Sequence, residues 1–387
     1  MEMNMSVFES TRLRTTAALA GLFLLAACGP SIPPSIKIGV AQPLSGPSAA
    51  RGQDVLNGVK LAAAEINAAG YKIAGKPVTI EIVTVDDKAD KETAKVVAQQ
   101  LVDQKVTAVI GHLSSDISEV TIPIYKEGNV PQLFTSSATS LMALGAGNTF
   151  RLLANDGLQA KAIVSYINEN VKASTVAIIY EDTSFGRPIS KDLNEGFGKL
   201  KSKITVNMGV DNKASDFTDL IAKLKAEPPQ ALICVLRDNQ LLPLFKQLKE
   251  AGLSELPVLT TNSSKTDKLA KAPADIKTLY VTSSALEPLE FVAGASFLKK
   301  FNEAYKADPV WGAHYAYDAM YVLADVLRRS DSVDPKVLRE KLHTVDPISP
   351  ITSSMRFNAE GEQPYGAISV YRKRDGQWAP LMRSDRW

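Results

Sequence analysis

Short apolar runs rich in β-branched residues recur along the chain, and each is bounded by polar or turn-forming residues. Runs of this length and composition are typical of buried β-strands. The strands predicted in this way are 36–40, 78–85, 106–110, 132–134, 175–180, 204–210, 231–236, 258–261 and 279–282.

Helical periodicity fills the intervals between these strands. Val55, Val59 and Ile66 fall on one helical face, and the pattern stops at Gly70. Further helices are predicted at 94–102, 156–171, 288–305, 311–328 and 335–343. Because strands and helices alternate, we expect parallel sheets covered by helices on both faces, which is the doubly wound α/β class.

The series of strands and helices divides into two such sheets in tandem. The first runs to about residue 153, and the second begins with the helix at 156–171. The end of the chain is strand-like at 355–357, 367–372 and 378–381, and glycine and proline separate these segments.

Two short loops rich in hydroxyl side chains follow neighbouring predicted strands. Ser114-Ser115-Asp116 comes soon after the strand at 106–110, and Thr135-Ser136-Ser137-Ala138-Thr139 directly follows the strand at 132–134. Serine and threonine often only cap the helix that follows. A pair of such loops, however, directs backbone N–H and side-chain O–H groups toward one place, where a carboxylate can bind.

The first 27 residues have the features of a secretory signal peptide. Arg12 and Arg14 precede an apolar stretch at 17–27, which is too short to span a bilayer stably. The stretch ends in Leu25-Ala26-Ala27-Cys28. This string resembles a bacterial lipobox, so that Cys28 is expected to carry a lipid after cleavage. Residues 28–35 contain three prolines and are predicted to be a tether between the lipid and the folded body.

The length of the chain bears on its number of domains, and its net charge bears on the kind of partner it can bind. Removal of residues 1–27 from the 387 leaves 360, which is enough for two domains because single cores stop growing at about 250 to 300 residues. The cleaved segment carries two basic and two acidic residues, so the formal net charge stays at +2 and nothing indicates nucleic-acid binding. No later stretch is apolar enough to cross a membrane. If Cys28 is acylated, Cys234 has no disulfide partner and is predicted to be a small buried hydrophobe.

Several motifs give the chain a specific resemblance over nearly its whole mature length. They are PLSGP at 43–47, GVKLAAAEINAAG at 58–70, Asp86-Asp87, VIGH at 109–112, YEDTSFG at 180–186 and YAYDA at 315–319. With these motifs the chain resembles the leucine/isoleucine/valine-binding type of periplasmic solute-binding protein, which feeds an ABC importer.

The resemblance implies the type I periplasmic binding fold. Two Rossmann-like doubly wound lobes are joined by three crossovers and close over a solute. The crossovers are expected near 153–156, 282–286 and 352–355. The N-terminal lobe would then take 36–154 plus 284–353, and the C-terminal lobe 155–283 plus 354–387. A permease and an ATPase are the implied partners, and the implied location is the periplasm or cell envelope.

The resemblance also implies a ligand site between the lobes. In such proteins the first lobe grips a carboxylate through a hydroxyl of the first loop and through the backbone and hydroxyls of the second, and the neighbouring loop residues form the wall. Phe185 matches the aromatic side chain that covers the ligand from the second lobe. The implied residues of the first lobe are Leu113, Ser114, Ser115, Ser137, Ala138 and Thr139.

Two departures from the family pattern leave the solute open. Amino-acid binders supply an acidic residue to the α-ammonium from a second-lobe loop, and here that position is Asn262. Arg237 stands where an uncharged residue is expected; it either faces the cleft and favours a second anionic or electron-rich group, or pairs with Asp238 or Asp182 on the surface. Glu181 or Asp182 could instead accept an ammonium group.

Enzymatic motifs are absent or out of context. The GxxxxGK spacing at 70–76 is followed by proline and lies between a helix and a strand, so it is interpreted as a turn. SxxK at 296–299 falls on an amphipathic helix without its companion motifs. The three histidines have no metal-ligand partner at helical spacing, and His112 is expected to be a hydrogen-bonded structural residue. No enzyme activity, metal or cofactor is therefore expected.

The sequence thus predicts an exported, lipid-anchored solute-binding protein. The expected solute is a branched-chain or other hydrophobic amino acid. An aromatic or other ammonium-free organic acid is the alternative, as is a sensory role in which the bound protein signals to a receptor.

Overall fold

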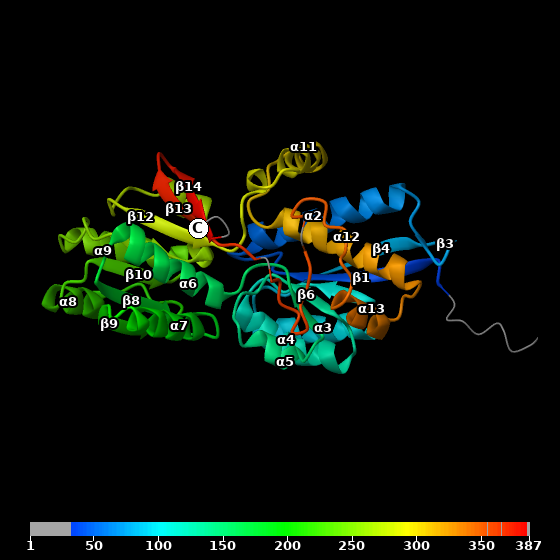
Figure 1. The fold of residues 1–387 in the computed structure, drawn as a ribbon, viewed down its shortest axis with the longest axis horizontal. Coiled ribbons are helices and arrows are strands. Elements are labelled where there is room, and N and C mark those ends of the chain that lie inside the picture. Colours follow the sequence, from blue (N-terminus) through cyan, green and yellow to red (C-terminus); the bar gives the residue numbers. More distant parts are fainter. Residues whose placement is uncertain (1–31, 354, 365, 385–387) are drawn as a thin grey trace, which may run out of the picture.

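Two helix-covered β-sheets lie one after the other along the long axis of the molecule (Figure 1). This is a computed structural model, and it describes residues 32–353, 355–364 and 366–384. The predicted signal peptide at 1–27, the lipidation site Cys28 and the start of the tether lie outside these residues. The predicted pair of doubly wound lobes is confirmed.

The first sheet contains five parallel strands in the order β4-β1-β5-β6-β7. Its central strand β5 consists of three fully buried apolar residues, as expected for a sheet that is covered on both faces. The edge strand β7 was not predicted because it is only three residues long and contains an arginine. The strands are β1 Ser35–Gln42, β4 Thr79–Asp86, β5 Ala108–Ile110, β6 Gln132–Phe134 and β7 Thr149–Arg151.

Helices cover both faces of this sheet. On one face α2 packs against α12, and Gly58 permits the close approach because a Cβ there would lie 2.1 Å from the carbonyl oxygen of Ala313. On the other face α3 and α4 pack around the buried Tyr125. The helices of this lobe are α2 Ala49–Ala68, α3 Lys91–Asp103, α4 Ser115–Glu127, α5 Leu141–Gly145, α11 Gly294–Tyr305, α12 Ala313–Ser330 and α13 Pro335–Leu342.

The second sheet contains seven strands in the order β14-β13-β12-β11-β10-β8-β9. The first five in sequence are parallel, and the C-terminal hairpin β13–β14 adds to the edge in antiparallel orientation. The strands are β8 Thr175–Glu181, β9 Lys203–Val210, β10 Ala231–Val235, β11 Val258–Thr260, β12 Leu279–Ser283, β13 Ser369–Arg374 and β14 Gln377–Arg383.

The helices of the second lobe also divide between the two faces of its sheet. Apolar side chains of α6 and α7 pack on one face, and those of α8 and α9 pack on the other, where Cys234 is buried as predicted. The helices are α6 Asp156–Tyr166, which continues as the π-helical turn η1 Ile167–Val171, α7 Gly186–Lys199, α8 Thr218–Ala226, α9 Asp238–Glu250 and α10 Asp267–Lys271.

The remaining short elements bear on two predictions, the turn at 70–76 and the helix at 288–305. The GxxxxGK segment forms the hairpin of β2 Lys72–Ile73 and β3 Lys76–Pro77, which is a turn as expected. The helix predicted at 288–305 is wrong at its start, since the 3-10 turn η3 Pro288–Glu290 is separated from α11 by the non-helical residues 291–293. A further 3-10 turn, η2, covers Asn262–Ser264.

The third connection between the lobes lies later than predicted. Met355 and Phe357 belong to the core of the first lobe and are not in a strand, and the backbone N–H of Arg151 donates to the carbonyl of Gly361 at 2.9 Å. Position 361 requires glycine, because the Cβ of any other residue would lie 1.9 Å from the carbonyl oxygen of Thr149. The chain thus stays on the first lobe beyond the expected crossover at 352–355 and joins the second sheet at Ser369.

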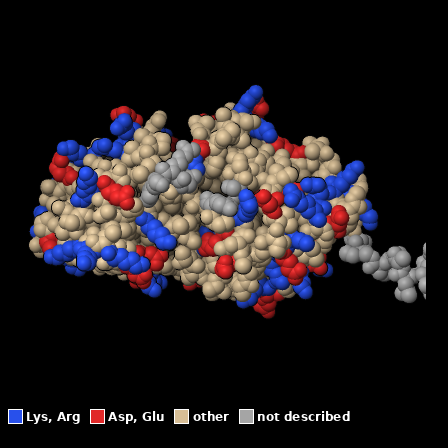
Figure 2. Space-filling model, in the orientation of Figure 1, with Lys and Arg blue, Asp and Glu red and all other residues tan. Residues whose placement is uncertain are grey.

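The surface shows no concentration of one charge on the face seen in Figure 2. Basic and acidic side chains are interspersed over both lobes there, in agreement with the small net charge. In the described part of the chain, no helix combines the length and the apolar character needed to cross a membrane.

Candidate functional site

A small cavity of about 80 Å³ lies between the two lobes. Its walls come from loops at the carboxyl ends of strands, next to the points where the strand order reverses, between β1 and β5 in the first sheet and between β8 and β10 in the second. Ligands of open α/β sheets bind at such switch points. Seven of the nine predicted ligand-binding residues line this cavity: Leu113, Ser114, Ser115, Ser137, Phe185, Arg237 and Asn262.

The first hydroxyl loop brings a helix N-terminus to the cavity. Ser114 is the N-cap residue of α4, and Ser115 is its first helical residue. The Ser115 Oγ accepts the backbone N–H of Ala138 at 3.2 Å, so its own proton is directed elsewhere. Free N–H groups at the start of a helix and a hydroxyl donor together form an anion site.

A buried arginine of the first lobe donates hydrogen bonds to the backbone of the second hydroxyl loop. Arg151 on β7 donates to the carbonyl oxygens of Ser136 and Ala138, and its Nε donates to Glu362 at 2.9 Å. These bonds fix the loop backbone, so that Ser137 lines the cavity. Arg151 was not among the predicted site residues because the strand that carries it was not predicted.

Two predicted residues of this loop lie outside the cavity wall. Ala138 is fully buried, and its N–H and carbonyl are both used within the first lobe, by Ser115 and Arg151. Thr139 turns toward Gly157 at the start of α6, where its Cγ2 would lie 3.5 Å from a Cβ placed on that glycine. Ala138 and Thr139 are thus not among the residues that line the cavity.

Arg237 from the second lobe faces the cleft. It precedes α9, its Nε donates to Glu181 at 2.9 Å, and its Nη2 lies 3.8 Å from Asp116 of the first lobe. The predicted surface pairing with Asp238 or Asp182 is not what the structure shows. Glu181 is fully buried, and burial raises the pKa of its carboxyl while the Arg237 guanidinium opposes that shift. Arg237 is thus paired with Glu181, which is one of the two acidic residues considered as a partner for an ammonium group of the solute.

Asn262 also lines the cavity, and its orientation is set by residues near the crossovers. Its Oδ1 accepts from Gln159 Nε2 at 3.2 Å, and its Nδ2 donates to Ser284 at 3.3 Å. The other acid considered for an ammonium group, Asp182, is paired with Arg187 on the surface at 3.0 Å. Neither Glu181 nor Asp182 is therefore available to pair with an ammonium group in the cavity.

Several residues of the cavity wall were not predicted from the sequence. They are Pro43, Ser48, Arg51, Asp87, Ala89, Thr135, Ser263 and Trp311. A signal for Pro43, Ser48 and Arg51 existed, since they follow β1, whose carboxyl end lies at the same edge as the hydroxyl loops. Trp311 could not be placed because it is far from every strand in sequence. Its loop is fixed by Asp54, whose carboxylate accepts the N–H groups of Val310, Trp311 and Ala313.

His112 has the structural role predicted for it. It is fully buried, and its ring nitrogens lie 2.6 Å from Asp87 Oδ2 and 3.1 Å from the Tyr125 hydroxyl. Asp87 Oδ1 in turn accepts the N–H of Ala89 at 2.8 Å. Among the residues that the structure describes, no group of His, Cys, Asp and Glu is arranged to hold a metal ion.

The two lobes contact each other across the cleft. Arg51 of the first lobe donates to the carbonyl of Lys265 in the second at 3.0 Å. Ser184 of the second lobe donates through its N–H to Asp116 at 3.1 Å and through its hydroxyl to Glu119 at 2.5 Å. These bonds connect the two lobes directly across the cleft.

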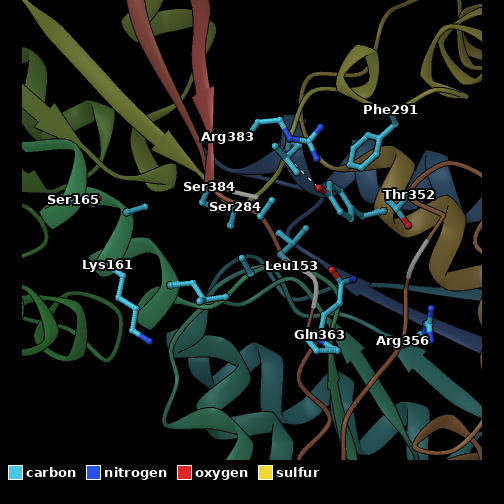
Figure 3. Close-up of a pocket in the computed structure, with 18 residues that line it drawn as sticks. Leu153, Lys161, Ser165, Ser284, Phe291, Thr352, Arg356, Gln363, Arg383 and Ser384 are labelled. Atoms are coloured by element: carbon cyan, nitrogen blue, oxygen red, sulfur yellow. Dashed lines mark hydrogen bonds between the residues drawn. The ribbon is translucent and has the colours of Figure 1, made fainter. Parts of the chain in front are cut away.

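A second, larger cavity of about 940 Å³ is bounded by the connections between the lobes (Figure 3). Leu153, Ser284 and Gln363, which lie on or beside the three connections, all contribute to its wall. Size alone favours this cavity as a binding site. Neither hydroxyl loop reaches it, however, and the smaller cavity holds the convergent donors that a carboxylate needs. The smaller cavity is therefore the candidate site.

Comparison with known proteins agrees with this arrangement. The family model described as "Periplasmic binding protein" matches residues 35–377. The chain belongs to the periplasmic binding protein family. This membership confirms the predicted fold and a binding protein in place of an enzyme.

Relatives of this periplasmic binding protein include proteins with different ligands. The "Leu/Ile/Val-binding protein homolog 2" of Brucella abortus is 28% identical over 361 residues, which cover 92% of this chain and 95% of that protein. LivJ of Streptococcus pneumoniae, solved in complex with isoleucine, is 23% identical with a TM-score of 0.78, covering 90% of this chain and 99% of that one. A solute-binding protein of R. palustris, solved in complex with benzoate, is 19% identical with a TM-score of 0.76, covering 90% and 96%.

Proposed function

We propose that this protein is the solute-binding component of an ABC importer and that it captures a small organic carboxylate between its lobes. The observation that carries the proposal is the convergence of Ser115, Ser137 and the N-terminus of α4 on one cavity between two lobes. Two arginines, Arg51 and Arg237, line the same cavity and make it favourable for an anion.

The similar proteins are named for, or were solved with, two classes of solute. The name of the Brucella abortus protein refers to leucine, isoleucine and valine, and the Streptococcus pneumoniae protein was solved with isoleucine. The R. palustris protein was solved with benzoate, which has no ammonium group. Both classes share the carboxylate that the hydroxyl loops are suited to bind.

The charges at the cavity favour an ammonium-free acid over an amino acid. Among the described residues that line the cavity, Asp87 is the one carboxylate, and His112 and the N–H of Ala89 already contact its oxygens. Asn262 stands where an acid was expected, and an amide cannot neutralise a buried ammonium group. A branched-chain amino acid remains the second candidate because the relatives' names favour it.

The supporting experiment is a thermal-shift panel on the mature chain, residues 28–387, with amino acids, their keto-acid counterparts and aromatic acids. A binding protein gains about 2.7 kcal/mol at a hundredfold excess of solute over its dissociation constant, and the solute is recovered unchanged. Consumption of the compound would indicate an enzyme instead. A deletion strain that keeps its uptake of the bound acid would contradict the importer role and favour a sensory one.

We also propose that the protein is anchored in the cell envelope through a lipid on Cys28. The lipobox-like string Leu25-Ala26-Ala27-Cys28 supports this. Metabolic labelling with a fatty acid tests it, since the wild-type protein is expected to be labelled and to sediment with membranes. A Cys28→Ala variant that is labelled to the same extent would contradict the anchor.

A further inference from the structure

Arg51 places a guanidinium group inside the ligand cavity. The residue lies in the first turn of α2, and its Nη2 donates to the carbonyl oxygens of Lys265 at 3.0 Å and Asn262 at 3.4 Å in the second lobe. Its Cζ lies 5.6 Å from the ring centroid of Trp311. Arg51 therefore reaches across the cleft and is held over an aromatic ring.

The charge of Arg51 has no close anionic partner in the described part of the chain. No carboxylate oxygen of these residues lies within 4 Å of its nitrogens, whereas Arg237 is paired with Glu181 and Arg151 with Glu362. Burial lowers the pKa of Arg51 to about 10, and attraction to Asp238 only partly opposes this. Arg51 is only partly exposed to solvent, and a charge that is partly withdrawn from water is costly unless it is paired. Carbonyl oxygens accept its hydrogen bonds but do not neutralise its charge.

A second donor lies beside this guanidinium. The indole Nε1–H of Trp311 is buried and has no hydrogen-bond partner among the described residues. Trp311 lines the same cavity as Arg51. Its backbone is fixed by the N–H bond to Asp54 at 2.8 Å, so that the indole is held in place next to the guanidinium. Arg51 thus presents a charged donor to the cavity, and the Trp311 ring lies against the guanidinium.

The hydroxyl loops do not account for the Arg51 guanidinium. One carboxylate is accounted for by Ser115, Ser137 and the N-terminus of α4, none of which carries a positive side chain. We propose that Arg51, positioned against the ring of Trp311, binds a second anionic group of the solute, so that the solute is a dicarboxylic acid or an acid with an equivalent second anion. This inference rests on the proposed function and specifies its substrate class.

Matched pairs of acids test the inference. Calorimetry on the mature chain compares butanoate with butanedioate, hexanoate with hexanedioate, benzoate with benzene-1,4-dicarboxylate, and 2-aminohexanoate with 2-aminohexanedioate. In at least one pair we expect the dicarboxylate to bind at least tenfold more tightly than its partner. The ratio of the two dissociation constants is the readout, because any general effect on lobe closure cancels in it.

Three variants connect that ratio to Arg51. Arg51→Met is expected to bring the ratio close to one, and Arg51→Lys is expected to keep part of the preference because it keeps the charge. Arg187→Met is the matched control, since Arg187 is an exposed arginine of the second lobe that pairs with Asp182 outside the cavity. It should leave the ratio unchanged.

The outcomes separate this inference from the proposed function. If monocarboxylates bind as tightly as dicarboxylates, or if Arg51→Met weakens both members of a pair equally, Arg51 only connects the lobes and the inference is overturned while the proposed function stands. If no acid of either class binds, the proposed function fails and the inference fails with it.

Discussion

Replacement of Ser115 by alanine tests the hydroxyl site most directly. The Ser115 Oγ accepts the N–H of Ala138, and no described residue accepts its own proton, so the proton is available to a carboxylate in the cavity. A hydrogen bond to a charged group contributes about 1.5 to 3 kcal/mol. Ser115→Ala is therefore expected to weaken the binding of the preferred acid by about 10- to 160-fold, as measured by calorimetry.

The same substitution has a second, separable effect. Without the serine oxygen the N–H of Ala138 is buried and unpaired, which costs about 1 to 3 kcal/mol in the free energy of unfolding measured in urea. Thr139→Ala is the matched control because it removes a hydroxyl from the neighbouring loop that lies outside the cavity wall. Unchanged affinity in Ser115→Ala, or an equal loss in Thr139→Ala, would refute this description of the site.

Three further predictions concern the scaffold around the cavity. Asp54→Ala is expected to lower the free energy of unfolding by at least about 2 kcal/mol in urea titrations, because three backbone N–H groups near Trp311 lose their acceptor; a variant as stable as the wild type would disprove that role. Gly58→Ala is expected to cost about 1 to 3 kcal/mol, seen as a lower Tm, since its Cβ would lie 2.1 Å from the carbonyl oxygen of Ala313; an unchanged Tm would show that α2 and α12 can separate freely. Burial raises the pKa of Asp156 to about 7, so the folded protein keeps a proton that the unfolded chain releases above about pH 4. The stability of the wild type relative to Asp156→Asn should therefore fall as the pH rises from about 4 to about 7 and stay level above that, and urea titrations across this range that show a constant difference would contradict the raised pKa.

Much of the fold could be predicted from local patterns. Most strands were located within a few residues, because the central ones, such as β5 and β10, consist of apolar side chains that are buried on both faces of a sheet. The edge strand β7 and the segment at 355–357 could not be predicted correctly. Both depend on a neighbour distant in sequence: Arg151 pairs with the backbone of Gly361, and Met355 and Phe357 are buried only because the first lobe covers them.

The candidate site was predictable where it depends on the ends of strands. Ser115 and Ser137 line the cavity because their loops follow the neighbouring strands β5 and β6, and the carboxyl ends of parallel strands share one edge. Thr139, in the same loop as Ser137, does not line the cavity, because the direction of a side chain within a loop depends on the bonds that fix the loop. Here Arg151 supplies those bonds.

The sequence by itself therefore determined the class of fold, the order of its elements and the two hydroxyl loops, because these follow from periodicity and strand order over short stretches. Only the tertiary structure decided which charges face the solute. Arg51 lies more than 200 residues in sequence from its partners Asn262 and Lys265. Arg237, which precedes α9, pairs with Glu181 at the end of β8. Electrostatic interactions of this kind depend on distance and burial in space, which no local pattern of residues contains.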